Sequence, residues 1–108
     1  MKILIIGATG YVAQHLIDSL VVDGVGSSLI SACRTLPGKL AFTEVGKYVR
    51  VDFSQSRSDV AEQLTAVFAA ERPSIIVNCA AQSSLGVCEK DPTAAFCANC
   101  PLGLLDAL

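Results

Sequence analysis

The chain has 108 residues, of which 52% are hydrophobic and 17% charged, and this size and composition fit one small folded domain. Its net charge of −2 gives no electrostatic reason to expect nucleic acid or an anionic membrane surface as a partner. No apolar run approaches the roughly 18 residues of a membrane-spanning helix, and the run after Lys2 is too short for a secretory signal. We therefore expect a single cytoplasmic domain.

The first third of the chain predicts a strand, a helix and a second strand. Residues 2–7 (KILIIG) are nearly all apolar, which is typical of a strand buried on both faces. Residues 11–24 have helical spacing and end at Gly24. The predicted apolar positions of this helix are Val12, Leu16 and Leu20. Residues 28–33 (SLISAC) predict the second strand.

The middle of the chain predicts a loop, a third strand and an amphipathic helix. Residues 34–46 are loop-like, with a turn at Pro37-Gly38. Residues 47–53 (KYVRVDF) predict a strand, and residues 56–73 predict a helix that ends at Pro73. The apolar face of this helix consists of Val60, Leu64, Val67 and Phe68, and its polar face of Glu62, Gln63 and Glu71.

The last third predicts a strand and a final helix. Residues 74–81 (SIIVNCAA) are a fourth apolar strand, and residues 82–90 are a polar connection. Asp91 suits a helix cap and Pro92 a first turn, so the last helix begins here and runs toward the end of the chain. Pro101 has no N–H, and we expect a kink there.

Alternating strands and helices predict an α/β fold with a parallel sheet and right-handed crossovers. Between the first strand and helix, Gly7, Gly10 and Ala13 form a G-x-x-G-x-x-A pattern. Gly7 permits a tight turn, Gly10 permits close approach of a pyrophosphate, and Ala13 lets the helix lie on the sheet. The pattern predicts a dinucleotide site in a Rossmann-type sheet with strand order 3-2-1-4 and helices on both faces. A plain glycine turn is the structural alternative.

The five cysteines are an odd number without a signal peptide, which favours reduced thiols. Cys97 and Cys100 form a C-x-x-C, a spacing also found in redox pairs and zinc sites. The chain has no second C-x-x-C, and its one histidine, His15, is distant in sequence. We therefore expect no metal and treat these cysteines as small buried side chains.

Four segments together resemble the extended short-chain dehydrogenases/reductases, over the whole chain. They are residues 7–16 (GATGYVAQHL), 51–55 (VDFSQ), 73–84 (PSIIVNCAAQSS) and 88–100 (CEKDPTAAFCANC). The last segment is similar to an E-x-D-P-x-x-A-x-x-x-N helix. It narrows the resemblance to the dTDP-4-dehydrorhamnose reductase branch, which includes the methionine adenosyltransferase β regulatory subunit.

The resemblance implies a set of site residues. Around the pyrophosphate it places Gly7, Thr9, Gly10, Tyr11 and Val12. Beside the adenine it places Asp52 and Phe53, and along a ribose it places Cys79, Ala80 and Ala81. Asn99 aligns with the asparagine that helps to hold a proton-relay water. Each has a structural alternative: a strand-end turn for Asp52, packing for the alanines, and local hydrogen bonding for Asn99.

The preference between NAD and NADP is decided at the end of the second strand. An acidic residue there would bind the ribose 2′-hydroxyl and repel a 2′-phosphate. This chain instead has Arg34 and no acid, and a guanidinium can bind a phosphate bidentately. We therefore expect NADP as the cofactor, with NAD the weaker ligand. The alternative is an exposed surface arginine.

The chain departs from the family in lacking the catalytic Y-x-x-x-K pair, because neither Tyr11 nor Tyr48 has a lysine four residues later. We expect residues 1–108 to be an N-terminal fragment or a shortened product without a substrate domain. Several leucines should then lack partners: Leu102, Leu104, Leu105 and Leu108.

Two functions remain open at this point. One is the NADP-binding half of a reductase of 4-keto nucleotide sugars, inactive alone. The other is a non-catalytic cofactor-binding regulator, compatible with a homo-oligomer or a partner enzyme. A shortened product without useful binding is a third interpretation.

Overall fold

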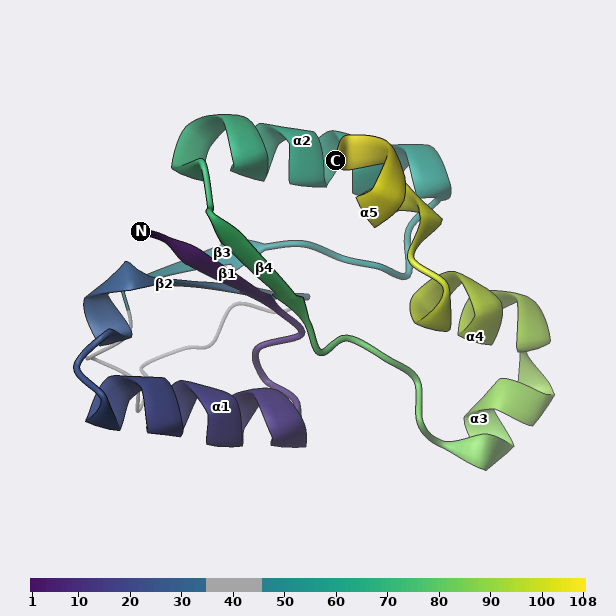
Figure 1. The fold of residues 1–108 in the computed structure, drawn as a ribbon. Coiled ribbons are helices and arrows are strands. Elements are labelled where there is room, and N and C mark those ends of the chain that lie inside the picture. The colour runs from purple at the N-terminus through teal and green to yellow at the C-terminus, as the bar shows by residue number, and fades with distance from the viewer. Residues whose placement is uncertain (35–45) are drawn as a thin grey trace.

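The computed structural model describes residues 1–34 and 46–108, which form a four-stranded parallel sheet with helices on both faces (Figure 1). The strands are β1 (Ile3–Ile6), β2 (Leu29–Cys33), β3 (Lys47–Arg50) and β4 (Ile75–Asn78). The helices are α1 (Tyr11–Val22), α2 (Arg57–Glu71), α3 (Leu85–Lys90), α4 (Pro92–Asn99) and α5 (Leu102–Ala107), with a 3₁₀ turn at Gly26–Ser28.

The order across the sheet is β3-β2-β1-β4, so the predicted Rossmann-type fold and strand order are confirmed. The predicted turn at Pro37-Gly38 lies outside the described residues. Helix α1 covers one face, whereas α2 and α5 cover the other, and α3 and α4 lie beyond the end of β4 (Figure 1). None of the helices in the described ranges has the length and apolar character needed to cross a membrane.

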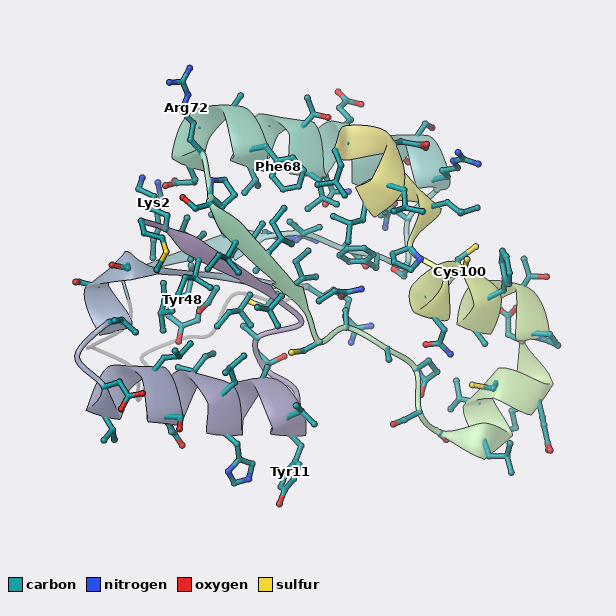
Figure 2. The ribbon with its side chains drawn as sticks, in the orientation of Figure 1. Lys2, Tyr11, Tyr48, Phe68, Arg72 and Cys100 are labelled. Atoms are coloured by element: carbon teal, nitrogen blue, oxygen red, sulfur yellow. The ribbon has the colours of Figure 1, made fainter. Side chains whose placement is uncertain are left out.

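The two central strands are buried along their whole length, which accounts for their apolar sequences. Side chains that alternate along them supply two separate cores. The core beneath α1 is formed by Ile3, Ile5, Ala8, Ala13, Ile17 and Leu29. The core beneath α2 and α5 is formed by Leu4, Ile6, Ile30, Ala32, Val51, Val60, Leu64 and Leu104. Val67 and Phe68 pack against the second core, so the predicted apolar face of α2 is confirmed (Figure 2).

The predicted apolar face of α1 is wrong at one position. Val12 is 68% exposed, and the buried residues of the helix are Ala13 and Ile17. Leu16 and Leu20 pack beside them, as predicted. The small side chain of Ala13 faces the sheet because this first turn lies close to the end of β1, where a larger residue would hold the helix away.

Glu71, which the sequence places on the polar face of α2, is not exposed to solvent. This last residue of α2 is only 7% exposed, and its carboxylate accepts hydrogen bonds from Lys2 at 3.2 Å and from Lys47. A carboxylate at a helix C-terminus is unfavourable by itself, because the dipole end there is negative. The two lysines supply the compensating charge from the segment before β1 and from the start of β3.

The C-terminal third differs most from the prediction. Residues 85–90, expected as a polar connection, form α3, because the Ser84 hydroxyl accepts from the Val87 N–H and caps the helix. The final helix is divided rather than kinked. α4 ends at Asn99 and α5 begins at Leu102, since Pro101 has no N–H to continue the helix.

Helix α5 packs tightly on α2. A Cβ on Gly103 would stand 2.8 Å from the Arg57 carbonyl oxygen, so the two helices meet at a glycine. The Arg57 guanidinium donates two hydrogen bonds to Asp106, at 2.6 and 2.7 Å. Leu104 is buried by this contact, whereas Leu105 and Leu108 are 63% and 74% exposed. The expectation of unpartnered leucines is thus wrong for Leu104.

We predict that Glu71→Gln lowers the free energy of unfolding at neutral pH and reduces the Tm by a few degrees. Hydrogen bonds from Lys47 and Lys2 hold the pKa of Glu71 below its ordinary 4.5. A carboxylate with a lowered folded-state pKa stabilises the protein above its unfolded pKa and loses that contribution as the pH falls through the folded value. The difference between the two proteins should therefore shrink as the pH falls below about 4.5. Denaturant titrations across this range test the expectation.

Glu62→Gln, on the exposed face of the same helix, should change little. A pH-independent difference for Glu71→Gln would contradict the charge assignment.

Candidate functional site

A cleft of about 400 Å³ opens at the carboxyl edge of the sheet, at the end of β1. Strand β1 has β2 as its neighbour on one side and β4 on the other. Such a switch point is where open α/β sheets bind ligands. Nine of the predicted site residues line it: Gly7, Thr9, Gly10, Arg34, Asp52, Phe53, Cys79, Ala80 and Ala81. Tyr11, Val12 and Asn99 do not.

The turn after β1 forms the floor of the cleft. Gly7 has a φ of +75°, and its N–H and that of Ala8 both donate to the Ala32 carbonyl, at 2.9 and 3.0 Å. A Cβ on Gly7 would stand 2.7 Å from the Ala80 nitrogen. The end of β1 therefore lies directly against the chain after β4, which only glycine allows.

Gly10 forms the N-cap of α1, without a side-chain cap for the helix. Its own N–H donates to the Gly7 carbonyl at 3.0 Å, which closes the turn. A Cβ on Gly10 would meet only the Gly7 oxygen, at 3.3 Å, and the space beyond is open. The first N–H groups of α1 and the positive end of its dipole therefore stand at the cleft, an arrangement suited to an anion.

The side chains of Tyr11 and Val12 lie outside the cleft and are exposed. The Tyr11 ring is 81% exposed and points away from the sheet (Figure 2). It packs edge-to-face on His15, with 4.6 Å between ring centroids. Gln14, which the sequence analysis did not single out, donates to the Ala8 carbonyl at 2.6 Å and fixes the helix to the turn.

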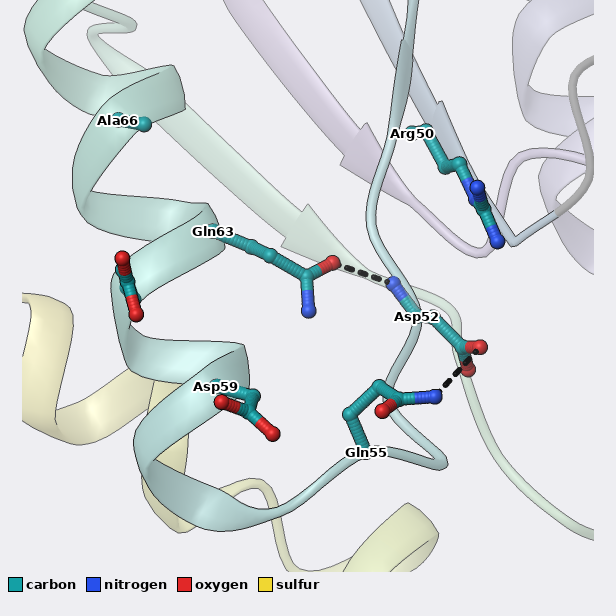
Figure 3. A pocket seen from close by; sticks show the side chains of 7 residues that line it. Arg50, Asp52, Gln55, Asp59, Gln63 and Ala66 are labelled. Atoms are coloured by element: carbon teal, nitrogen blue, oxygen red, sulfur yellow. Dashed lines mark hydrogen bonds between the residues drawn. The ribbon is translucent and has the colours of Figure 1, made fainter.

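Asp52 is 9% exposed and held in its own turn (Figure 3). Its Oδ1 accepts from the Ser54 N–H at 2.9 Å and from the Ser54 hydroxyl at 2.6 Å. The Gln55 amide donates to Oδ2 at 3.4 Å, and the Asp52 N–H donates to Gln63 at 3.0 Å. The Ser54 bonds, with a smaller effect of Arg34, lower the pKa of Asp52, so the carboxylate stays ionised at the cleft. Asp52 therefore stabilises its own turn, as the structural alternative predicts. Its Oδ2 accepts only the longer hydrogen bond, from Gln55.

Asn99 lies outside the cleft and contacts a segment that lines it. Its amide nitrogen donates to the Gln82 carbonyl at 3.0 Å, and its oxygen accepts from the Gln82 N–H at 2.7 Å. This pair of bonds ties α4 to the segment after β4, where Gln82 lines the cleft. The sequence analysis did not find Gln82, because nothing in the sequence links it to a residue 17 positions later.

A second, larger hollow of about 640 Å³ lies outside β3, against α2 (Figure 3). Its lining is Arg50, Asp52, Gln55, Asp59, Glu62, Gln63 and Ala66. Neither Gly7 nor Gly10 lines this hollow, and the N-terminus of α1 does not face it. The cleft at the sheet edge is therefore the better candidate for a dinucleotide.

The C-x-x-C cysteines differ from their predicted environment. Cys97 is exposed and Cys100 half-buried, so the expectation that both are buried is wrong. Both thiols are free. Within the described ranges, no group of three or more His, Cys, Asp or Glu side chains is placed to hold a metal ion.

A family model described as RmlD substrate binding domain matches residues 1–102. The chain belongs to this RmlD family. A comparison with curated proteins finds no match.

Solved structures agree with the family and with the resemblance to extended short-chain dehydrogenases/reductases. The chain is 27% identical to the Thermus thermophilus UDP-glucose 4-epimerase solved in complex with NAD, with a TM-score of 0.76, covering 99% of this chain and 32% of that one. For the Thermotoga maritima UDP-glucose 4-epimerase with UDP-glucose, the values are 26% identity, a TM-score of 0.71, and coverages of 99% and 32%.

The L-threonine dehydrogenase of Clostridium difficile shares the fold, at 23% identity and a TM-score of 0.74, covering 97% of this chain and 31% of that one. This RmlD family member thus spans about a third of the length of the structures that it matches.

We predict that Gly7→Ala destabilises the protein by about 1–3 kcal/mol through positive-φ strain alone. The total loss should be larger, because the new methyl group would also meet the Ala80 backbone. Gly24→Ala is a matched control. Gly24 has a similar φ of +82° but nothing within 4 Å of a Cβ. Chemical denaturation of both variants measures the difference. Equal losses would mean that the contact between β1 and Ala80 is unimportant.

Proposed function

We propose that this chain is the NADP(H)-binding part of an extended short-chain reductase that acts on a 4-keto nucleotide sugar. The observation that carries the proposal is the turn from Gly7 to Gly10, which opens the cleft at the switch point of the sheet. Membership of the RmlD family and likeness to nucleotide-sugar epimerases support the substrate class. We place the protein in the cytoplasm, in keeping with its five free thiols.

The residues of the cleft fit a dinucleotide in three regions. The backbone from Gly7 to Val12 would bind the pyrophosphate, because it presents N–H groups and no side chain at Gly10. Asp52 and Phe53 would lie beside the adenine. The small residues Cys79, Ala80 and Ala81, with Gln82, would line the ribose nearer the nicotinamide. Asn99 would act by holding Gln82 in place.

NADP is the proposed cofactor because of the charge at the end of β2. Arg34 lines the cleft there, and none of the residues Leu29–Cys33 is acidic. Strand β2 itself therefore contributes no carboxylate that would repel a 2′-phosphate. The alternative is that Arg34, which is exposed, is only a surface charge. The Arg34→Ala variant distinguishes this role from phosphate binding.

NADPH supplies hydride when bound, and the chain's own residues provide its binding and orientation. In the described part of the chain, no tyrosine lines the cleft. Tyr11 points outward, and the Tyr48 hydroxyl is buried beneath the sheet. The proposed reductase activity therefore belongs to a longer protein that supplies a tyrosine and a lysine.

We predict that NADP(H) binds tighter than NAD(H) and that Arg34→Ala removes most of the difference. One charge-assisted phosphate contact is worth ~1.5–3 kcal/mol, or roughly one to two orders of magnitude in affinity. NAD binding should barely change, because the pyrophosphate site is separate. Calorimetric titration with both cofactors measures the ratio.

Gly10→Val is the companion variant for this titration. It should weaken both cofactors, since a branched side chain would fill the open space at the turn. An unchanged NADP/NAD ratio in Arg34→Ala would remove the basis for choosing NADP.

We also predict that the 108-residue protein has no reductase turnover, because it contains no Y-x-x-x-K pair. The test follows NADPH oxidation by the purified protein with a 4-keto nucleotide sugar. Sustained oxidation above a protein-free blank would show that another group donates the proton.

A further inference from the structure

Arg50, the last residue of β3, stands next to Arg34 although 16 residues separate them in sequence. Parallel pairing aligns Arg50 with Cys33, and the Val51 N–H donates to the Cys33 carbonyl at 3.1 Å. Neighbouring strands lie about 4.8 Å apart, so the two arginines lie on adjacent strand ends at the carboxyl edge. The Arg50 Nε donates to the Arg34 carbonyl at 3.1 Å, and both residues are exposed.

The acid beside this pair, Asp52, offsets its charge only in part. Asp52 directs its carboxylate to Ser54 and Gln55. Within residues 1–34 and 46–108, the ion pairs involve Lys2, Lys47 and Arg57, and neither Arg34 nor Arg50. Two guanidinium groups therefore lie at this strand end without an ion pair in the described ranges, although Asp59 and Glu62 line the hollow beside Arg50. Because like charges repel, an anion that contacts both arginines is favoured there.

We propose that Arg50 is a second determinant of cofactor preference, which together with Arg34 clamps the 2′-phosphate of NADP. The proposal rests on the proposed function, since Arg34 lines the proposed cofactor cleft and Arg50, which lines the neighbouring hollow, bonds to Arg34. A guanidinium carries five N–H donors in a fixed fork. Arg50 uses Nε for the Arg34 carbonyl, which fixes its direction and leaves the terminal nitrogens for phosphate oxygens. Its restraint by the backbone also reduces the entropy lost on binding.

A competing role for Arg50 is purely structural. It lines the outer hollow with Asp59 and Glu62, and its bond to Arg34 could serve only to hold the end of β2. The two roles differ in what a substitution changes. A tether would affect every adenine nucleotide, because Arg34 and Asp52 would shift with the strand end. A phosphate contact would affect only ligands that carry a 2′-phosphate.

The test uses 2′,5′-ADP and 5′-AMP, which differ in the 2′-phosphate alone. The purified 108-residue protein is titrated with each, together with Arg50→Gln, Arg34→Gln and the double variant. Arg72→Gln is the matched control, because Arg72 is an exposed arginine at the opposite end of the sheet (Figure 2). Thermal unfolding without nucleotide checks that each variant is folded.

We expect Arg50→Gln to weaken 2′,5′-ADP by roughly tenfold or more, with 5′-AMP unchanged and Arg72→Gln without effect on either. Equal weakening of both nucleotides, or no weakening, would overturn the clamp while leaving the proposed function in place. Failure of the unsubstituted protein to bind either nucleotide would overturn the proposed function and the clamp together.

Discussion

The close contact between the end of β1 and the chain after β4 determines the geometry of the site. The Gly7 N–H donates to the carbonyl of Ala32 in β2. The Cys79 N–H, just after β4, donates to the carbonyl of Ile6 in β1 at 2.9 Å. The ends of three strands are thereby joined within one turn. With no side chain at Gly7, the backbone near Ala80 can approach, and the cleft opens directly above this contact. A larger residue would separate the strand ends and change the position of every group that lines the cleft.

Charge is distributed unequally between the two edges of the sheet, although the chain as a whole carries only −2. At the amino edge, two lysines surround the buried carboxylate of Glu71 and connect β1, β3 and α2. At the carboxyl edge, Arg34 and Arg50 emerge beside a carboxylate that is already bonded within its turn. One edge is thus closed by ion pairs, while at the other, within the described ranges, neither Arg34 nor Arg50 forms an ion pair. Net charge describes the average of these two environments and predicts neither.

Local sequence was sufficient for the sheet and the glycine turn, because each depends on neighbouring residues. The buried strands are short apolar runs, and Gly7 and Gly10 stand between a strand and a helix. It failed where partners come from distant segments. The spacing places Glu71 on a polar face and gives no sign of Lys2, which lies 69 residues away. Strand register and a hydrogen bond bring Arg50 to Arg34, and neither can be seen in the local sequence. Val12 was misplaced for another reason. A hydrophobic residue at helical spacing gives no sign that the smaller Ala13 will face the sheet.

The C-terminal helices connect the packing on one face of the sheet to the wall of the cleft. Gly103 lets α5 approach the Arg57 carbonyl, and the bidentate contact of Arg57 with Asp106 fixes the direction of the helix. Pro101 separates α5 from α4, so each can take its own angle. Asn99, at the end of α4, forms hydrogen bonds with both the N–H and the carbonyl of Gln82. A continuous series of contacts therefore runs from the start of α2 through α5 and α4 to the segment that lines the cleft. Asn99 thus holds the backbone of a segment that lines the cleft, through an element whose own position depends on a glycine and an ion pair.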